Sequence, residues 1–218
     1  MPNEFSSDTG KTRREYSRGT LEEAQIAKSP FDQFEAWFAE AQQIEEGEVN
    51  AMSLATSNAS GQPSVRMVLL KDIVPDGFIF FTSYASRKGS EIASNAKVAL
   101  LFYWPRLERQ VRIEGLCSTV DEALSDRYFQ SRPRNAQLGA TVSIQSKEIL
   151  TRAELEKAYS EAERSYDGQT IPRPKHWGGY IVRPNRFEFW QGRESRLHDR
   201  IQYQIDNGKE WRITRLSP

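Results

Sequence analysis

The sequence predicts a β-rich α+β fold, an antiparallel barrel or sandwich with peripheral helices. From Ala51 onward, short runs with strand periodicity follow one another and are separated by turn signals. Helical spacing is confined to a few stretches, and no G-x-G-x-x-G occurs to favour a Rossmann sheet. The 218 residues are enough for one large domain. We therefore expect a single domain over residues 20–218, preceded by a mobile segment over residues 1–19.

The N-terminal region begins with polar residues that lack periodicity. The basic cluster "TRREYSRG" in this segment is a candidate tail, or a flap that orders on a ligand. The stretch "SPFDQFEAWFAEAQQ" predicts the first helix, with Ser29 as N-cap and Pro30 at the first helical position. Its apolar stripe predicts core packing and comprises Phe31, Phe34, Trp37, Phe38 and Ala41.

The middle and the end of the chain alternate between predicted strands and helices. The predicted strands are "AMSLAT", "PSVRMVLLKDI", "FIFFTS", "KVALLFYW", "ERQVRIEGLCSTV", "YIVRPNRFEFWQG", "RLHDRIQYQI" and "KEWRITRL". The turns "SNASGQ" and "VPDG" and the hairpin signal "DNG" connect some of them. Helices are expected at "DEALSDRYFQSR" and "TRAELEKAYSEAERSY", where Thr151 and Glu154 have capping-box spacing.

Composition excludes several classes of function. Thirty Lys and Arg balance thirty Asp and Glu, so no global field attracts nucleic acid or an anionic membrane. A lone Cys117 excludes an intrachain disulfide and fits a small buried hydrophobe in a reducing, cytoplasmic protein. His176 and His198 are too few for a multi-histidine metal site, so no metal is expected. No nucleophile motif is present, which favours cofactor chemistry.

Three basic stretches are candidate anion sites. Ser86 is a plausible N-cap that places Arg87 and Lys88 in the first turn of a short helix, where cations oppose the helix dipole unless an anion lies nearby. Arg66 and Lys71 have an odd separation on a predicted strand and should point to opposite faces unless a bulge intervenes, so they would serve different anions. Tyr128 and Arg132 are one helical turn apart and could converge on a second phosphate. Solvated basic surfaces are the alternative in each case.

The C-terminal stretch "WQGRESRLHDR" also suggests a ligand site. If a strand begins at Arg196, then Arg196, His198 and Arg200 share one face, and Leu197 and Asp199 share the other. Cations flanking an imidazole repel one another, so this face favours an anionic or polar ligand. A solvated charged turn is the alternative.

The motifs "RMVLLK", "FFTSYASRKG", "LERQVRIEG", "YFQSRPR", "LGATVSIQS", "WGGYIVRPNRFEFWQG" and "RLHDR" occur in this order. With them, the chain from about residue 12 to its end resembles the pyridoxine (pyridoxamine) 5'-phosphate oxidase family. The resemblance implies an FMN-binding split barrel and a homodimer with FMN at the subunit interface. It also implies oxidation of pyridoxine or pyridoxamine 5'-phosphate to pyridoxal 5'-phosphate, with O2 as electron acceptor and H2O2 as product. A flavin reductase on the same barrel, or a non-catalytic FMN or pyridoxal-phosphate carrier, is the alternative.

The resemblance also implies roles for individual residues. The FMN contacts would be Arg66, Met67, Val68, Leu69, Leu70, Lys71, Phe81, Thr82, Arg87, Lys88, Gln110, Gln145, Ser146, Trp190 and Arg200. The substrate contacts would be Arg13, Arg14, Glu15, Tyr16, Lys71, Tyr128, Arg132, Ala136, Arg196, Leu197 and His198. Arg196 and His198 would be the catalytic pair, and we expect His198 to orient the substrate rather than act as a base. Ala136 departs from the family pattern, which usually has Ser there, and predicts weaker substrate binding.

Overall fold

The computed structural model describes residues 15–206 and 210–218, and its chain divides into two compact units. The central unit comprises residues 50–102 and 112–186. The terminal unit comprises the residues up to Val49 together with residues 103–111 and 187–218. The prediction that residues 20–218 form one domain stays a prediction.

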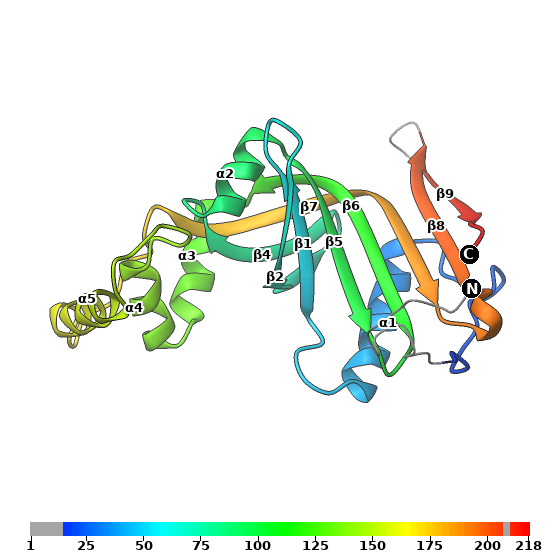
Figure 1. The fold of residues 1–218 in the computed structure, drawn as a ribbon, viewed down its shortest axis with the longest axis horizontal. Helices are drawn as coiled ribbons and strands as arrows, with labels where there is room; N and C mark the ends of the chain where they lie inside the picture. The colour runs from blue at the N-terminus through cyan, green and yellow to red at the C-terminus, as the bar shows by residue number, and fades with distance from the viewer. Residues whose placement is uncertain (1–14, 207–209) are drawn as a thin grey trace, which may run out of the picture. The chain divides into compact units, whose positions relative to one another are not determined.

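The central unit contains an antiparallel sheet (Figure 1). The strand order is β2-β1-β5-β6-β7-β4-β3. Strand β1 pairs antiparallel with β2 and β5, and β4 pairs antiparallel with β3 and β7. The strands lie where strands were predicted, except that the single strand predicted over residues 63–73 is divided into β2 and β3. They are β1 (Ala51–Ser57), β2 (Pro63–Leu69), β3 (Asp72–Val74), β4 (Gly77–Ser83), β5 (Lys97–Trp104), β6 (Arg109–Thr119) and β7 (Trp177–Gln191).

Every second side chain along β1 and β5 is buried, so this part of the sheet has one buried face. On β1, Met52 and Leu54 are fully buried while their neighbours are half-buried. On β5, Leu100 and Phe102 are fully buried in the same alternation. The predicted turn between β1 and β2 is confirmed, because Asn58 Oδ1 accepts hydrogen bonds from backbone N–H groups of the turn.

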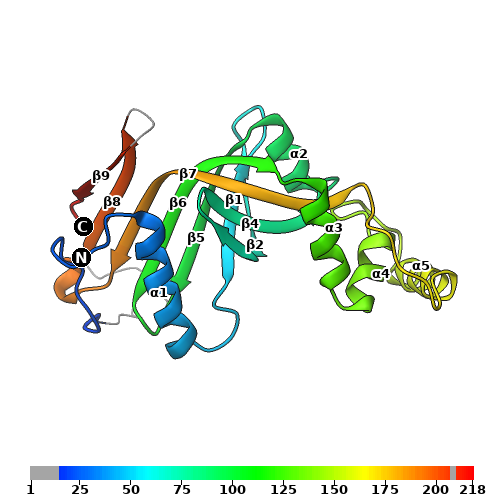
Figure 2. The same cartoon turned by 180° about the vertical axis from the view of Figure 1, so that it is seen from behind.

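Four helices belong to the central unit, and two views show α3, α4 and α5 grouped together (Figures 1 and 2). The predicted caps are confirmed: Ser86 caps α2, and the Thr151 side chain accepts from the N–H of Glu154. Helix α4 was not predicted from the sequence. It follows Pro133 directly and has no side-chain cap. The helices are α2 (Arg87–Ser94), α3 (Glu122–Ser131), α4 (Arg134–Val142) and α5 (Arg152–Ser165).

The terminal unit is built on α1 (Pro30–Ile44) and the strand pair β8 (Asp199–Asp206) and β9 (Glu210–Arg215). The predicted Ser29 cap and the aromatic core stripe are confirmed, with Trp37 packed edge-on against Phe189 at 5.3 Å. Strands β8 and β9 pair antiparallel, as predicted. The turn that joins them, at residues 207–209, lies outside the described residues.

The prediction that a strand begins at Arg196 is wrong. Glu194–Arg196 forms a 3-10 turn, labelled η2, and β8 begins at Asp199. Ser195 and Arg196 have φ values of 53° and 61°, in the left-handed region, which interrupts an extended chain. Arg196, His198 and Arg200 therefore do not form one strand face.

Three further observations concern the described residues. No described helix is long and apolar enough to cross a membrane. The described part of the chain holds no group of three or more His, Cys, Asp or Glu residues placed to hold a metal ion. Cys117 is buried, as predicted, and burial raises the pKa of its thiol to about 12.

Candidate functional site

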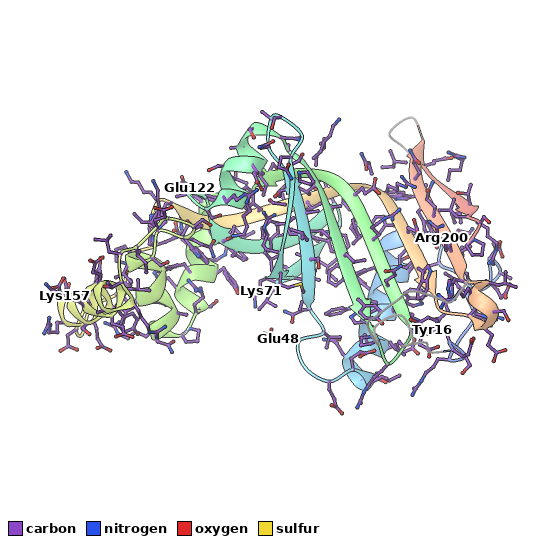
Figure 3. All side chains as sticks on the ribbon, in the orientation of Figure 1. Tyr16, Glu48, Lys71, Glu122, Lys157 and Arg200 are labelled. Atoms are coloured by element: carbon purple, nitrogen blue, oxygen red, sulfur yellow. The ribbon has the colours of Figure 1, made fainter. Side chains whose placement is uncertain are left out.

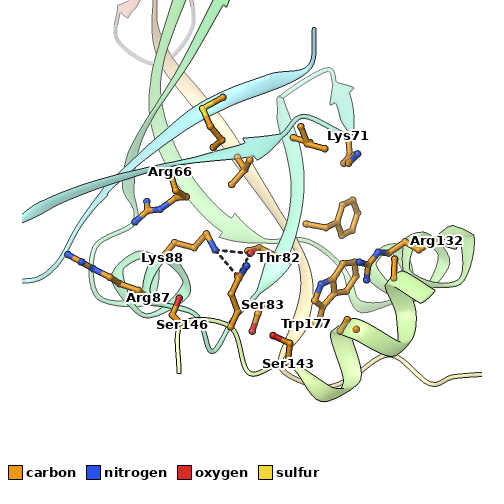
Figure 4. Close-up of a pocket in the computed structure, with 18 of the residues that line it drawn as sticks. Arg66, Lys71, Thr82, Ser83, Arg87, Lys88, Arg132, Ser143, Ser146 and Trp177 are labelled. Carbon is orange, nitrogen blue, oxygen red and sulfur yellow. Dashed lines mark hydrogen bonds between the residues drawn. The ribbon is translucent and has the colours of Figure 1, made fainter. Parts of the chain in front are cut away.

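The central unit contains a cavity of about 910 Å³, within the range of small-molecule sites (Figure 4). The loop after α4, the strands β2 and β4 and the helices α2, α3 and α4 all contribute to its walls. It gathers most of the predicted contacts, namely Arg66, Met67, Val68, Leu69, Lys71, Phe81, Thr82, Arg87, Lys88, Tyr128, Arg132, Ala136, Gln145 and Ser146. Predicted contact Leu70 is a buried core residue and is not part of this lining.

One group of cations is organised around the buried carboxylate of Glu91. Arg66 Nη2 lies 3.2 Å from Glu91 Oε2, and Arg87 Nε lies 2.9 Å from Glu91 Oε1. Burial alone raises the pKa of Glu91, but hydrogen bonds from Ser64, Thr56, Arg87 and Arg66 lower it to about 2. The charged carboxylate therefore fixes the directions of two guanidinium groups beside the cavity.

Lys88 lies next to these arginines on the first turn of α2, as predicted. It is 7% exposed, and its Nζ donates to Gln145 Oε1 at 2.7 Å and to Thr82 Oγ1 at 3.1 Å. Burial and the charge of Arg66 lower the pKa of Lys88 to about 8. None of its partners among the described residues is a carboxylate. An enclosed ammonium with neutral partners is suited to an anionic ligand.

Glycine at position 89 lets α2 begin at this point. A Cβ there would lie 2.1 Å from the carbonyl oxygen of Tyr84, closer than any side chain tolerates. The Ser86 Oγ accepts from the Gly89 N–H at 3.3 Å and so caps the helix. The close contact and the cap together set where the first turn of α2 meets the cavity.

A second group of cations lies in another part of the cavity, where Figure 4 shows Lys71 and Arg132 apart from Arg66 and Lys88. The Arg132 guanidinium lies 4.6 Å above the Trp177 ring. Its Nη1 is buried and has no hydrogen-bond partner among the described residues. Burial lowers the pKa of Arg132, against the influence of Tyr128. A buried donor without a partner is costly, which indicates a ligand with an acceptor atom.

The end of strand β2 explains why Arg66 and Lys71 do not point to opposite faces. Both residues line the same cavity, although their odd separation predicted opposite strand faces. The strand ends at Leu69, so alternation does not extend to Lys71. Instead the Lys71 N–H donates to the carbonyl oxygen of Ile79 at 2.8 Å. The prediction that they serve different anions stays a prediction.

An aromatic wall between the cation groups was not predicted from the sequence. Phe81 and Tyr128 stack with ring centroids 3.8 Å apart, and Phe81 and Trp177 stack at 5.7 Å. The sequence feature that could have indicated close packing at Trp177 is the glycine pair that follows it. A Cβ at Gly179 would lie 2.8 Å from the Phe81 ring, so the pair permits close packing beside the wall. Other lining residues that the sequence reasoning missed are Ser64, Val65, Ser83, Gly139, Ala140 and Ser143.

The remaining predicted contacts belong to the terminal unit, including Tyr16 in the N-terminal segment and Arg200 on β8 (Figure 3). The His198 ring lies 4.7 Å from the Trp190 ring and 5.7 Å from the Tyr16 ring. Arg200 Nε donates to Glu188 Oε1 at 2.8 Å. Arg13 and Arg14 lie outside the described residues, and the others in this unit are Glu15, Gln110, Arg196 and Leu197.

Asp199, which received no chemical role from the sequence, organises the turn before β8. It is 9% exposed, and its Oδ2 accepts from Arg193 Nη1 at 2.8 Å and from the Leu21 N–H at 3.1 Å. Its Oδ1 accepts from Arg215 Nη1 at 2.7 Å. Burial alone raises the pKa of Asp199, and these hydrogen bonds lower it overall. The charged carboxylate thus ties together three segments that are distant in sequence.

Comparison with known proteins connects both units to one group of enzymes. The family model described as pyridoxamine 5'-phosphate oxidase matches residues 38–166. The model described as pyridoxine 5'-phosphate oxidase C-terminal dimerisation region matches residues 177–218. A pyridoxine/pyridoxamine 5'-phosphate oxidase of Bordetella pertussis is 55% identical over 206 residues, covering 94% of this chain and 97% of the relative. One of Rubrobacter xylanophilus is 50% identical over 218 residues, covering all of both chains.

Solved structures agree with the sequence matches. The crystal structure of PhzG from Burkholderia lata, in complex with tetrahydrophenazine-1-carboxylic acid, has a TM-score of 0.85 and 30% identity. It covers 91% of this chain and 98% of that one. An FMN-binding protein of Nostoc punctiforme, related to pyridoxamine 5'-phosphate oxidase, has a TM-score of 0.71 at 16% identity, covers 88% of this chain and all of that one, and supports the fold alone. The split-barrel fold expected from the resemblance is thereby confirmed.

Proposed function

Because the chain belongs to the pyridoxamine 5'-phosphate oxidase family, we propose that it oxidises pyridoxine or pyridoxamine 5'-phosphate to pyridoxal 5'-phosphate. FMN is the cofactor, O2 is the electron acceptor and H2O2 is released. The observation that carries the proposal is one cavity with two separate groups of cations, because cofactor and substrate each bring a phosphate. A cytoplasmic location, supported by the single unpaired cysteine, is part of the proposal.

The first group of cations fits the FMN phosphate. Lys88 offers a buried ammonium whose partners are neutral, and Arg66 is held beside it by Glu91. Arg87 shares the same carboxylate and supports them. A phosphate at the start of α2 would also remove the conflict between two cations and the helix dipole. FMN, when bound, supplies the hydride acceptor for the oxidation.

The second group of cations fits the phosphate of the substrate, the phosphorylated vitamer pyridoxine or pyridoxamine 5'-phosphate. The unpaired Arg132 Nη1 is a donor that a phosphate oxygen satisfies, and Lys71 and Tyr128 line the same cavity. A guanidinium held over Trp177 is already oriented, so little side-chain entropy is lost on binding. Arg132→Gln should therefore raise KM for the phosphorylated vitamer, by roughly tenfold or more, and should leave FMN binding intact.

The residues of the terminal unit complete the proposed site from a second copy of the chain. The match to a C-terminal dimerisation region supports a homodimer, and we propose that FMN lies at its interface. Arg196 and His198 then contact the vitamer ring, Arg200, Trp190 and Gln110 contact FMN, and Arg13 to Tyr16 cover the substrate. These residues bind and orient the reactants, which is the main contribution of the protein to the reaction.

The decisive experiment follows the flavin absorbance of the purified protein after pyridoxine 5'-phosphate is added without oxygen. We expect bleaching, and recovery of the absorbance with H2O2 formation when air is admitted. A yellow protein that does not bleach would favour a reductase or a carrier, and NADH added in its place would separate the two. A colourless protein that cannot take up FMN would overturn the cofactor assignment.

A further inference from the structure

The imidazole of His198 has one nitrogen committed to the protein. Nδ1 accepts a hydrogen bond from the backbone N–H of Arg193 at 3.1 Å. A backbone amide can only donate, so the nitrogen that faces it carries no proton. In a neutral imidazole the proton must then reside on Nε2.

The surroundings of His198 favour its neutral form. Burial and the charge of Arg196 lower the pKa of His198 from its ordinary value, and the charge of Asp199 acts in the opposite direction. The ring is packed edge-on against Tyr16 and at a tilt against Trp190, and neither side chain offers it a carboxylate. Nε2 has no hydrogen-bond partner among the described residues. The ring therefore presents an N–H donor to whatever binds beside it.

Asp199 holds the backbone that fixes this tautomer. Its Oδ2 pairs with the Arg193 side chain at 2.8 Å, and it is anchored in turn by Arg215 and by the Leu21 N–H. Ser195 and Arg196, both at positive φ, turn the chain back so that His198 meets the Arg193 amide. The ion pair and this strained turn act on the same short segment.

We propose that His198 is held as the Nε2–H tautomer and serves as a hydrogen-bond donor to the vitamer, not as its general base, and that Asp199 is the positioning residue that secures this state. The role of the donor rests on the proposed function, whereas the tautomer is a property of the protein alone. The acceptor would be an oxygen or nitrogen substituent of the vitamer ring, which the N–H orients toward FMN. A base would need an unprotonated nitrogen facing the substrate, and Nδ1 faces Arg193 instead.

The first test is nitrogen NMR of the full-length protein, labelled with 15N-histidine and studied with and without added FMN at pH 8. Only His176 and His198 contribute signals, and the spectrum of His176→Asn assigns them. We expect His198 to show a protonated Nε2 and an unprotonated Nδ1. A protonated Nδ1, or two tautomers in comparable amounts, would overturn the proposal without affecting the oxidase assignment.

The second test compares three variants in anaerobic flavin reduction at saturating substrate. The amide nitrogen of Gln reaches the position of Nε2, whereas that of Asn reaches only the position of Nδ1. We expect His198→Gln to stay within about tenfold of the wild-type rate, and His198→Asn and His198→Ala to be slower than His198→Gln. If His198→Gln lost the roughly 10²–10⁴-fold expected for removal of a general base, equally with His198→Ala, the donor role would be wrong.

The third test separates positioning by Asp199 from general stability. Asp199→Asn keeps the shape but weakens the pair with Arg193, and we expect both histidine tautomers to become populated in the NMR spectrum. Glu23→Gln is the matched control, because it removes another partner of Arg215 but leaves Arg193 and Asp199 paired. An unchanged His198 spectrum in Asp199→Asn, or the same change in Glu23→Gln, would refute the role of Asp199.

Discussion

At the scale of single residues, the Lys88 ammonium has the property most open to measurement. Its pKa is lowered to about 8, and a bound phosphate dianion favours the charged form and raises that value. The affinity for FMN should fall by no more than about twofold from pH 7 to 8, and then by up to tenfold per pH unit until the pKa of the complex is reached. Titration of the flavin-free protein with FMN at several pH values measures this.

Two variants test the assignment to Lys88. Lys88→Arg keeps its charge at all these pH values, so its FMN affinity should not fall between pH 8 and 9. Lys88→Met should bind FMN weakly and with no step near pH 8. A wild-type affinity that is level from pH 7 to 10 would contradict the proposed contact between Lys88 and the phosphate.

Ala136 lines the cavity at a position where the resemblance to the family leads us to expect Ser, so the proposed phosphate site would lack one hydroxyl. Its N–H already donates to Asn135 Oδ1 at 2.8 Å, and the methyl group offers no donor. Ala136→Ser should gain a neutral hydrogen bond of about 0.5 to 1.5 kcal/mol and lower KM by up to roughly tenfold. We expect kcat to change little. Steady-state kinetics with an unchanged KM would show that the hydroxyl has no acceptor there.

At the scale of elements, α2 depends on its cap. The Ser86 Oγ accepts from Gly89 N–H, donates to the Ser83 carbonyl oxygen at 2.7 Å and lies 3.3 Å from Lys88 Nζ. Ser86→Ala should lower the free energy of unfolding by about 1–2 kcal/mol and also weaken FMN binding. Thr151→Ala removes an exposed cap from α5 and should lower stability alone. Denaturation curves measure the stability of both variants, and FMN titrations measure their affinity for FMN. If Ser86→Ala bound FMN as tightly as Thr151→Ala, the link between the α2 cap and FMN binding would be disproved.

How far the sequence predicts each element depends on whether the signal is local. Most strands and the caps at Ser29, Ser86 and Thr151 are set by periodicity and by side chains beside the helix start, and they were predicted, whereas the break between β2 and β3 was not. Helix α4 carries no such signal, because its N-cap is Pro133, which makes no side-chain hydrogen bond. The turn at Ser195 depends on contacts with distant Leu21 and Arg215 through Asp199, which no local pattern contains.

In the site, too, local features were predicted from the sequence and features that depend on long-range packing were not. The helix start at Ser86 predicted its two cations correctly, because a cap fixes the positions that follow it. The unpaired Arg132 Nη1 and the stack of Phe81 on Tyr128 arise from packing between separate elements. The resemblance identified most of the lining, but Trp177 emerged from the structure.

At the scale of the whole molecule, the predicted contacts are divided between two units of the chain. If FMN lies at a subunit interface, the two sets in one site come from different copies. Co-expressed Arg132→Gln and His198→Ala chains, each of low activity alone, should then regain activity as mixed dimers. Random pairing should yield about a quarter of the wild-type activity, since one site in each mixed dimer is intact.

Two differently tagged chains allow the mixed dimers to be purified and assayed. A particle mass of one subunit in light scattering, or mixed dimers no more active than their parents, would show that each copy uses the contact residues of its own central and terminal units. Activity restored in mixed dimers would instead establish sharing between copies.

The protonation state of the Cys117 thiol determines how readily the peroxide released by the proposed reaction can oxidise it. The proposed reaction releases one molecule of peroxide per turnover, and peroxide attacks thiolates rather than thiols. With a pKa of about 12 the thiol is ionised to roughly one part in 10⁵ at pH 7, and it is buried. The chain has no second cysteine that could trap a sulfenic acid as an intramolecular disulfide. We therefore expect the Cys117 thiol to resist oxidation by the peroxide that the proposed reaction releases.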